Sequence, residues 1–426
     1  MLSEGDCEVL LTRKSLAGAG IALMAMTVAA GAIIGGPPGP LLLGIRVEFF
    51  LFALTLFGVA LFHDRTLDVA LTGLTSIVLL KYLTTSGFSF AHHLWEEAPI
   101  LVNLLGLLLG FAVLARHFEQ SEIPEILPRF LPDDWKGGFT LLAMVFVLSA
   151  FLDNIAAAMI GGTVALHVFH RRLHIGYLAA IVAASNAGGS GSVLGDTTTT
   201  MMWIEGVSAF DVLHAYAAAI PAFLFFAVAA SRQQHAHHPI QAQPAGEHRV
   251  VWTRILAVVS ILAGAITTNI LLDFPAAGVW IAIIIAAAFT RTDWKVIPAT
   301  LKGTLFLLSL VTCASLMPVE TLPAASWQTA FGLGWVSAVF DNIPLTKLAL
   351  EQDGYDWGVL AYAVGFGGSM IWFGSSAGVA LSNMFPEARS VVNWIRRGWH
   401  VAVGYALGFA VLLLSYGWHP ETIPLQ

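Results

Sequence analysis

Two copies of one polar phrase stand inside long apolar segments of this sequence. The first copy reads Ser-Ala-Phe-Leu-Asp-Asn-Ile at residues 149–155, and the second reads Ser-Ala-Val-Phe-Asp-Asn-Ile at residues 337–343. An aspartate in the middle of a membrane segment is costly and usually serves a function, because its charge has to be balanced there. Asp153 and Asp341 are therefore candidate carriers of a cation or a proton.

A glycine-rich motif follows each copy of that phrase. Residues 188–196 read Gly-Gly-Ser-Gly-Ser-Val-Leu-Gly-Asp, and residues 367–375 read Gly-Gly-Ser-Met-Ile-Trp-Phe-Gly-Ser. Glycines let a membrane helix unwind, and the carbonyl oxygens freed in that way can replace part of a cation's hydration shell. The glycines expected to unwind the two helices are Gly188, Gly189, Gly195, Gly367, Gly368 and Gly374.

The side chains beside these breaks supply mainly oxygen atoms. Such a set suits Na⁺ or Li⁺, whereas the imidazole and thiolate ligands of transition metals are missing. A carboxylate in apolar surroundings is neutralised either by a cation or by a proton, and this competition is sufficient for antiport. We predict Na⁺ at Asp153, Asp196 and Asp341, with no resident cofactor. The predicted ion- and proton-binding residues are Asp153, Asn154, Asp196, Thr197, Thr198, Asp341, Asn342, Ser375 and Ser376.

A purely structural interpretation stays open for each of these features. Glycine runs also serve the packing of membrane helices. An aspartate or asparagine at a helix break also caps the helix. The repetition of both motifs in the same order favours an ion site over packing alone.

The composition is that of a polytopic membrane protein. Of 426 residues, 57% are hydrophobic and only 11% are charged, and the mean hydropathy is +0.77. We predict an all-α fold with about eleven transmembrane helices and two re-entrant helical hairpins. The crossings are expected at 16–34, 41–62, 66–83, 98–116, 175–204, 210–231, 251–272, 274–290, 302–318, 356–383 and 398–417, and the hairpins at 138–170 and 327–350.

The positions of Lys and Arg predict the orientation, because these residues concentrate on the cytoplasmic side. With the N-terminus inside and both interrupted segments re-entrant, seventeen of the twenty Lys and Arg residues fall inside. Only Arg46, Lys81 and Lys347 fall outside. We therefore predict a multi-pass protein of the cell inner membrane with a cytoplasmic N-terminus.

The duplicated motifs divide the chain into two repeats of opposite topology. Inverted repeats with interrupted segments at matching positions indicate a secondary transporter whose site lies near the bilayer midplane. The predicted parts are an extra N-terminal transmembrane helix in 1–40, a first repeat 41–231 with hairpin 138–170 and broken helix 175–204, a cytoplasmic linker 232–250, and a second repeat 251–426 with hairpin 327–350 and broken helix 356–383.

Residues 185–203 resemble the signature of the NhaD-type sodium/proton antiporters, within the ion transporter superfamily. Residues 149–155, 337–344 and 367–378 also resemble that family, and the similarity covers roughly residues 95–400. The resemblance implies inverted repeats with re-entrant hairpins and broken helices, exchange of Na⁺ or Li⁺ for H⁺, and assembly as a homodimer. One departure is that the family carries a glutamate in the crossing before the first hairpin, where this chain has Asn103 and no acid.

The first hypothesis is a Na⁺(Li⁺)/H⁺ antiporter that works by alternating access, with the lipid bilayer and a small cation as partners and no nucleic acid. The alternative is a sodium- or proton-coupled carrier of citrate or another organic anion from the same superfamily. Asp153 and Asp341 would repel such cargo unless Na⁺ bound first. A channel or scaffold would have no reason to bear the cost of duplicated aspartates. No nucleophile–base pair or cofactor motif indicates an enzyme.

Overall fold

The computed structural model describes residues 20–29, 41–42, 44–62, 65–240 and 249–423. Only residues 20–29 of the predicted N-terminal crossing fall in this part of the chain, and they are helical. The predicted linker 232–250 begins within a helix that continues to His237, and its residues 241–248 lie outside the described part.

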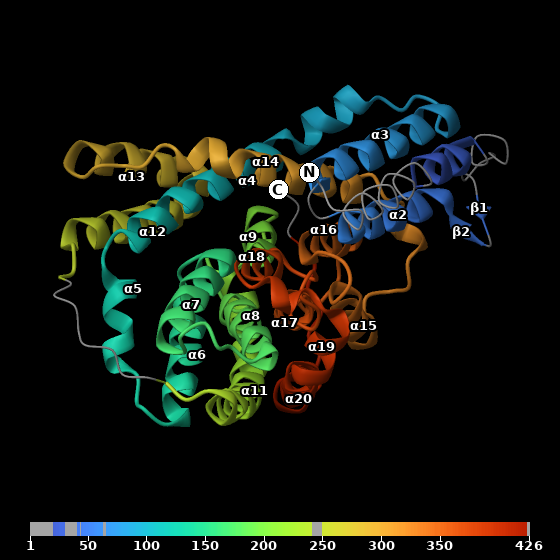
Figure 1. Ribbon diagram of the computed structural model, residues 1–426. Helices are drawn as coiled ribbons and strands as arrows, with labels where there is room; N and C mark the ends of the chain where they lie inside the picture. The colour runs from blue at the N-terminus through green and yellow to red at the C-terminus, as the bar shows by residue number, and fades with distance from the viewer. Residues whose placement is uncertain (1–19, 30–40, 43, 63–64, 241–248, 424–426) are drawn as a thin grey trace, which may run out of the picture. The chain divides into compact units, whose positions relative to one another are not determined.

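The described chain is helical apart from two strands of two residues each, which form one antiparallel pair (Figure 1). The predicted all-α architecture of a polytopic membrane protein is confirmed. In chain order the elements are β1 (Leu41–Leu42), β2 (Ile45–Arg46), α2 (Val47–Leu61), α3 (Thr66–Thr84), α4 (Phe90–Glu119), α5 (Ile123–Ile126), η2 (Leu127–Phe130), α6 (Trp135–Ser149), α7 (Asn154–Val168), α8 (Ile175–Gly189), α9 (Thr197–Ile204), α10 (Ala209–Leu213), α11 (Tyr216–His237), α12 (Trp252–Leu272), α13 (Pro275–Phe289), α14 (Val296–Ser315), η3 (Val319–Thr321), α15 (Trp327–Ser337), α16 (Asn342–Gln352), α17 (Trp357–Gly367), α18 (Ser376–Met384), η4 (Pro386–Arg389), α19 (Val391–Arg397) and α20 (Trp399–Ser415).

Several helices are long and apolar enough to cross a bilayer on their own. Among the described residues these are Thr66–Thr84, Phe90–Glu119, Ala209–His237, Trp252–Leu272 and Val296–Ser315, and α19 with α20 qualifies as a sixth span that bends by 59°. Shorter apolar helices, among them α6, α7, α8 and α17, belong to the predicted hairpins and broken helices. The number of eleven crossings stays a prediction.

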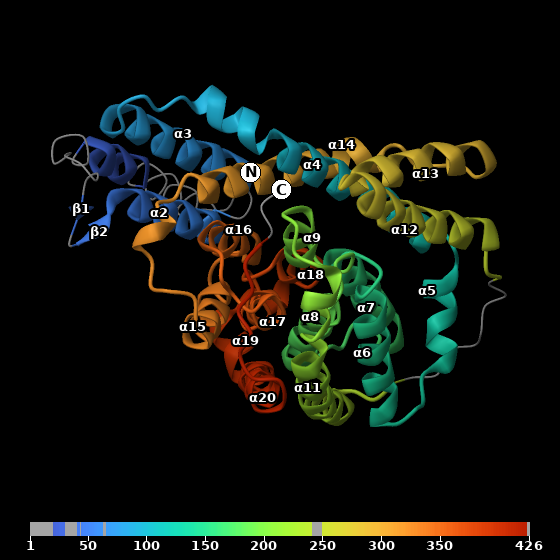
Figure 2. The same cartoon turned by 180° about the vertical axis from the view of Figure 1, so that it is seen from behind.

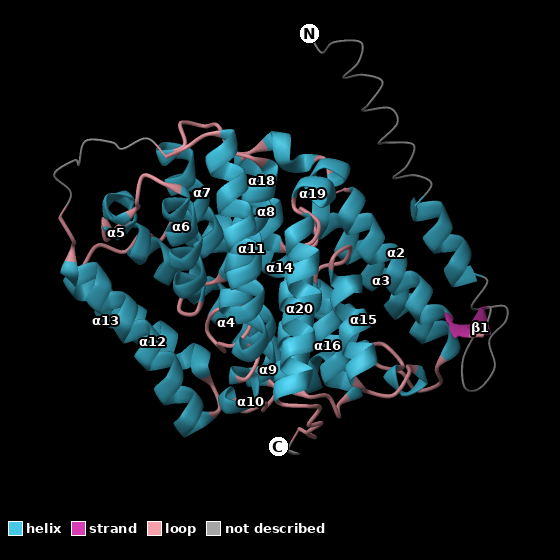
Figure 3. Cartoon of the chain, turned by 90° about the horizontal axis from the view of Figure 1, so that it is seen from below, coloured by secondary structure: helices cyan, strands magenta, loops and turns pink. Residues whose placement is uncertain are grey.

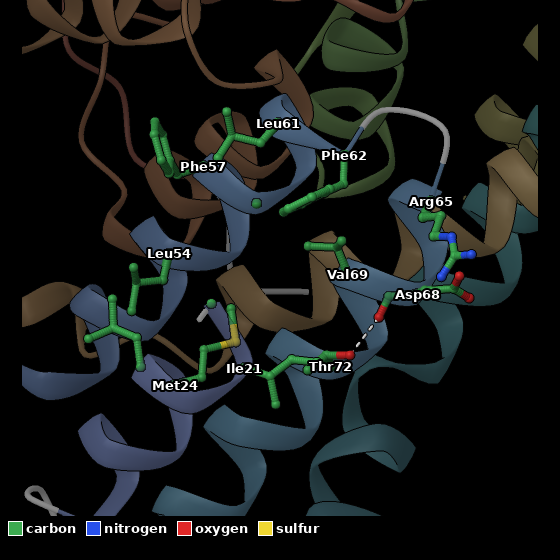
Figure 4. A pocket seen from close by; sticks show the side chains of 13 residues that line it. Ile21, Met24, Leu54, Phe57, Leu61, Phe62, Arg65, Asp68, Val69 and Thr72 are labelled. Carbon is green, nitrogen blue, oxygen red and sulfur yellow. Dashed lines mark hydrogen bonds between the residues drawn. The ribbon is translucent and has the colours of Figure 1, made fainter. Parts of the chain in front are cut away.

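The chain forms two compact units, each of which takes residues from both predicted repeats. The first unit consists of 1–99 and 305–322, and the second consists of 100–304 and 323–426. In the first unit, Gly73 of α3 lies against Thr55 of α2 at a distance that leaves no room for a Cβ atom. An apolar cavity of about 360 Å³ is lined there by residues 20–24, α2 and α3 (Figure 4).

The second unit contains all the predicted site residues. Each predicted hairpin consists of two helices, α6 with α7 and α15 with α16 (Figure 2). The Asp134 carboxylate accepts the Lys136 N–H at the start of α6, and Ser326 and Thr329 form a reciprocal capping box at the start of α15. Such caps satisfy backbone donors that a helix leaves free at its beginning.

Each predicted broken helix also consists of two helices, α8 with α9 and α17 with α18. The first hairpin helix packs against the first half of the broken helix in both repeats, so that α6 contacts α8 and α15 contacts α17. Helices α11 and α20 lie side by side and contact both broken helices (Figure 3). The second unit therefore holds the four breaks within one packed helical body.

Each repeat contains an equivalent hydrogen bond between its first hairpin helix and its broken helix. The Ser149 hydroxyl donates to the Ser185 carbonyl over 2.5 Å, and the Ser337 hydroxyl donates to the Val364 carbonyl over 2.8 Å. Ser149 and Ser337 open the two copies of the Asp-Asn phrase, and Ser185 and Val364 stand at the same position before their Gly-Gly pairs. Equivalent residues thus make equivalent bonds.

Candidate ion-binding site

Four helices begin at the breaks, and their N-cap residues are predicted site residues. Asp153 precedes α7, Asp196 precedes α9, Asp341 precedes α16 and Ser375 precedes α18. The N-terminus of a helix carries a partial positive charge that stabilises a nearby anion. The fold therefore places each of these oxygen-bearing side chains at the N-terminus of a helix.

Asp196 is the most enclosed of these carboxylates, with 1% of its surface exposed. Its Oδ1 atom accepts hydrogen bonds from Asn154 Nδ2 over 3.2 Å, from the Thr198 N–H over 3.2 Å and from the Thr198 hydroxyl over 3.3 Å. Its Oδ2 atom is buried and has no hydrogen-bond partner among the described residues. One oxygen of Asp196 is thus held in place, and the other is available to a proton or a cation.

Space for this second oxygen comes from the other repeat. A Cβ atom added to Gly365 of α17 would lie 3.0 Å from Asp196 Oδ2. Gly365 and Asn186 stand at the same position before their Gly-Gly pairs, so the two are equivalent residues of the repeats. The small residue in one repeat therefore accommodates the carboxylate of the other.

Asn186 connects the two repeats, although the sequence analysis did not select it as a site residue. Its Oδ1 atom accepts from Asn154 Nδ2 over 3.0 Å, and its Nδ2 atom donates to the hydroxyls of Ser369 over 2.9 Å and Ser375 over 3.1 Å. Asn186 lies within the apolar helix α8, shortly before the glycine motif. A polar amide at that position was the signal that could have identified it.

Thr198 provides a second connection between the two repeats. Asn342 Nδ2 donates to the Thr198 hydroxyl over 2.9 Å, and that hydroxyl in turn donates to Asp196 Oδ1. Asn154 and Asn342 thus both orient the Asp196 carboxylate, the first directly and the second through a threonine. Neither caps a helix in these contacts, which had been the alternative interpretation of both residues.

Asp341 and Asp153 lie at the hairpin breaks and are both partly exposed. Asp341 accepts the Ile343 N–H over 3.1 Å and the Ser376 hydroxyl over 3.3 Å. Thr197 is the first residue of α9 and is buried.

The described residues contain no group of three or more His, Cys, Asp or Glu side chains placed to hold one metal ion. The binding of Na⁺ at Asp153, Asp196 and Asp341 stays a prediction. A cation at Asp196 Oδ2 would take its other ligands from amide, hydroxyl or backbone oxygens, which suit Na⁺ and Li⁺.

The carbonyl groups of the first break are already engaged. The Thr199 hydroxyl donates to the Ser192 carbonyl over 2.6 Å, and the Thr200 hydroxyl donates to the Val193 carbonyl over 2.8 Å. The Ser192 carbonyl also accepts the Gly195 N–H over 3.1 Å, so both of its lone pairs are used, whereas the Val193 carbonyl keeps one acceptor position. The sequence analysis left Thr199 and Thr200 out of the site, and in the structure they stabilise the break.

The six predicted glycines lie in close contact with backbone carbonyls, and their role in unwinding the two helices stays a prediction. None of the six is among the positive-φ glycines of the described chain. Gly188 lies against the Phe146 carbonyl, and the equivalent Gly367 lies against the Gly334 carbonyl, too close for a Cβ atom. The other four lie equally close to backbone carbonyls, Gly189 to Gly195, Gly195 to Ser149, Gly368 to Gly374 and Gly374 to Ala338.

A cavity of about 700 Å³ lies beside the first break. Its lining includes Ala150 at the hairpin tip, Ser192 and Val193 of the break, and Asn269 and Asp273 at the end of α12. Irregular backbone at membrane depth is tolerated where it lines a cavity or is buried in protein.

Asn103 lies in the crossing for which the family resemblance implied a glutamate. Its side-chain oxygen accepts the Ala276 N–H at the start of α13 over 3.0 Å.

Comparison with known proteins adds a family and several relatives. The sequence model of the citrate transporter family, CitMHS, matches residues 65–367, a range that includes all the predicted site residues up to Gly367. Sodium/proton antiporter 1 of Arabidopsis thaliana is 27% identical over 381 residues, which cover 78% of this chain and 64% of the plant protein. The chain thus matches less than two thirds of that protein's length.

Two bacterial relatives are matched over more of their length. The Na⁺/H⁺ antiporter NhaD of Vibrio parahaemolyticus is 24% identical over 399 residues, which cover 75% of this chain and 94% of the relative. The Na⁺/H⁺ antiporter NhaD of Alkalimonas amylolytica is 25% identical over 388 residues, which cover 76% of this chain and 79% of the relative.

Proposed function

This chain belongs to the citrate transporter family and is a secondary transporter, and from that premise we propose that it exchanges Na⁺ or Li⁺ for H⁺ across the cytoplasmic membrane by alternating access. Relatives named sodium/proton antiporters support this choice of cargo. The chain acts in transport rather than in catalysis. Its partners in this proposal are the lipid bilayer and a small inorganic cation.

The observation that carries the proposal is the Oδ2 atom of Asp196, which is buried and has no partner among the described residues. A carboxylate removed from water needs a positive charge or a proton close by. A proton on Oδ2 and a cation beside Oδ2 would occupy the same space and exclude each other. Binding of one then releases the other, which is the elementary step of antiport.

The surroundings of Asp196 favour a small cation for the positively charged cargo. Asn154 and Thr198 hold Oδ1, so that Oδ2 stays fixed while the occupant changes. Asp153 and Asp341 add negative charge that attracts a cation toward Asp196. We assign ion and proton binding to Asp196 first, and assign Asp153 and Asp341 to attracting the cation at the two hairpin tips.

An organic anion such as citrate is the second candidate cargo. The family description favours it, and so do the helix N-termini at the breaks, whose partial positive charges suit an anionic group. In this chain, however, three of these four N-termini carry an aspartate. A polycarboxylate would therefore meet like charges unless Na⁺ had bound first, which makes sodium-coupled uptake the form this alternative takes.

Proton movement in everted membrane vesicles separates the two candidates. Addition of Na⁺ or Li⁺ is expected to release protons from vesicles with the wild-type chain, whereas K⁺ and citrate leave the proton gradient unchanged. Asp196→Asn is expected to abolish that release because asparagine still caps α9 but carries no charge. Asp133→Asn, which changes an exposed aspartate before α6, is the matched control and keeps wild-type exchange. Citrate uptake without cation-driven proton release would contradict the proposal.

A further inference from the structure

Two helix pairs connect the repeats on either side of the candidate site. Helices α9 and α16 contact each other, and α7 and α18 contact each other. Each pair takes one helix from each repeat, and all four helices begin at the breaks described above. An ion that leaves the site along these helices has to pass one pair or the other.

The α9–α16 pair contains a buried ion cluster. The ammonium of Lys347, a side chain with 2% of its surface exposed, lies 2.5 Å from Glu205 Oε1 and 2.8 Å from Glu351 Oε1. Glu205 is the C-cap of α9, and Lys347 and Glu351 lie one turn apart on α16. The sequence analysis had placed Lys347 on the outer side of the membrane and had selected neither Glu205 nor Glu351 as a site residue.

Each member of the cluster depends on the others. A buried ammonium is strongly unfavourable without a carboxylate partner. A carboxylate at the C-terminus of a helix faces the negative end of the helix dipole, and a nearby lysine offsets that repulsion. Separation of α9 from α16 would break the contact between Lys347 and Glu205. This separation is therefore strongly unfavourable unless water reaches both groups.

The α7–α18 pair has methionines at the equivalent positions. Met159 of α7 matches Lys347 when the two Asp-Asn phrases are aligned, and Met384 of α18 matches Glu205 when the two glycine motifs are aligned. A Cβ atom added to Gly162 of α7 would lie 2.5 Å from Leu381 Cδ1 and 3.5 Å from Met384 Sδ. One pair is thus closed by apolar contacts and the other by charges, so the charges are not a requirement of the shared architecture.

We propose that Lys347, Glu205 and Glu351 form a charged latch that closes the route from the Asp196 site along α9 and α16. The latch stays closed while this route is dry, and hydration of the three charges accompanies its opening. In the orientation predicted from the loop charges, this route leads to the outer face of the membrane. Lys347 is a positioning residue, because it acts on the spacing of two helices and touches no cargo.

Labelling of a buried cysteine tests the latch without any assumption about cargo. The probe is Met201→Cys in a chain whose native Cys7 and Cys313 are replaced, because Met201 is fully buried in α9, one of the two helices along this route. A membrane-impermeant maleimide is added to intact cells. Glu205→Gln and Lys347→Met are each expected to raise the labelling rate at least about fivefold, the lower limit of a typical conformational coupling.

Rescue and control variants distinguish a latch from general loosening. The exchanged pair Glu205→Lys with Lys347→Glu is expected to restore the parent labelling rate, because opposite charges again face each other. Asp133→Asn, which removes an exposed carboxylate before α6 and outside the latch, is the control and is expected to keep the parent labelling rate. Equal labelling of the parent and the latch variants, or failure of the exchanged pair to restore the parent rate, would overturn the proposal. Glu205→Gln keeps Lys347 paired with Glu351, so it tests the latch even where Lys347→Met does not reach the membrane.

A transport measurement then tests whether the latch acts in the proposed exchange. Among the experiments on the latch, only this one rests on that exchange. Half-saturating Na⁺ concentrations are compared between right-side-out and everted vesicles. Loss of the latch is expected to change the ratio of the two concentrations at least about fivefold, whereas a folding defect lowers turnover equally from both sides. A wild-type chain without cation-driven proton release would refute the exchange reaction, while the labelling result would still decide the latch.

Discussion

The two broken helices have the same backbone turn and different side chains. The Gly195 N–H donates to the Ser192 carbonyl in the first break, and the equivalent Gly374 N–H donates to the Ile371 carbonyl in the second, over 3.1 Å in both cases. The residue that then caps the next helix is Asp196 in the first break and Ser375 in the second.

This difference shows which features the helix break needs and which features serve ion binding. The helix break itself needs only a short polar cap, which serine supplies as well as aspartate. The first break adds a carboxylate with a free oxygen and threonine hydroxyls on its carbonyls, and it is the better candidate for binding the ion. The second break contributes Ser375 as an acceptor for Asn186 and thereby fixes the first.

The largest effect is expected when the first break is given the cap of the second. Asp196→Ser keeps a capping oxygen but removes the charge, so we expect cation-driven proton release to be abolished, as in Asp196→Asn. Ser375→Ala removes a neutral cap and one acceptor of Asn186, and is expected to reduce the rate less than tenfold. Everted-vesicle assays at equal expression compare the two, and similar losses would show that the breaks are chemically equivalent.

A smaller effect, equal in both repeats, is expected at the glycines that touch the first hairpin helices. Gly188→Ala and Gly367→Ala each place a methyl group against a backbone carbonyl, which cannot move aside as a side chain can. Overpacking of this kind costs about 1–3 kcal/mol. Thermal unfolding in detergent measures the loss. Gly332→Ala, which has open space around it, is the control and should unfold at the wild-type temperature.

The threonine hydroxyls offer a finer test of the same comparison. Val379 matches Thr200 when the two glycine motifs are aligned, so Thr200→Val gives the first break a residue that the second already has. The change removes the hydrogen bond to the Val193 carbonyl and is expected to cost about 1 kcal/mol of stability. The reciprocal Val379→Thr should be close to neutral in the same unfolding assay. A larger loss from Val379→Thr than from Thr200→Val would contradict the asymmetry.

The smallest effect is expected at a pair remote from both breaks, formed by Arg116 near the end of α4 and Asp293 in the loop between α13 and α14. The Arg116 side chain donates a hydrogen bond to Asp293 over 3.1 Å and lowers the pKa of that carboxyl below its ordinary value of 3.8. A lowered folded-state pKa adds stability above the unfolded-state value, and this contribution is lost as the pH falls through the folded-state pKa. Asp293→Asn should therefore unfold slightly earlier than wild type at pH 7, with the difference disappearing as the pH falls through the lowered pKa of Asp293. A difference that grew toward acid pH would contradict this sign.

The sequence was sufficient to predict the helical class of a membrane protein, because long apolar segments are conspicuous, while the repeats and the site residues stay predictions that rest on charges and glycines within those segments. Asn186 was not selected, since a single uncharged amide in a helix has no local pattern, and its importance comes from partners in the distant second repeat. Lys347 was treated as a loop charge because hydropathy does not reveal that Glu205 lies opposite it. The glycines were located correctly, but their contacts with hairpin carbonyls depend on tertiary packing.

The mirrored bonds of Ser149 and Ser337 have a consequence for motion. Each ties the first hairpin helix to the first half of its broken helix, and glycines bring the same two helices into backbone contact. A hairpin tip that bent alone would have to break this bond and open a close-packed interface. Each hairpin is therefore expected to travel with its broken helix as one rigid body, and the displacement during a transport cycle falls on the interfaces between the two bodies.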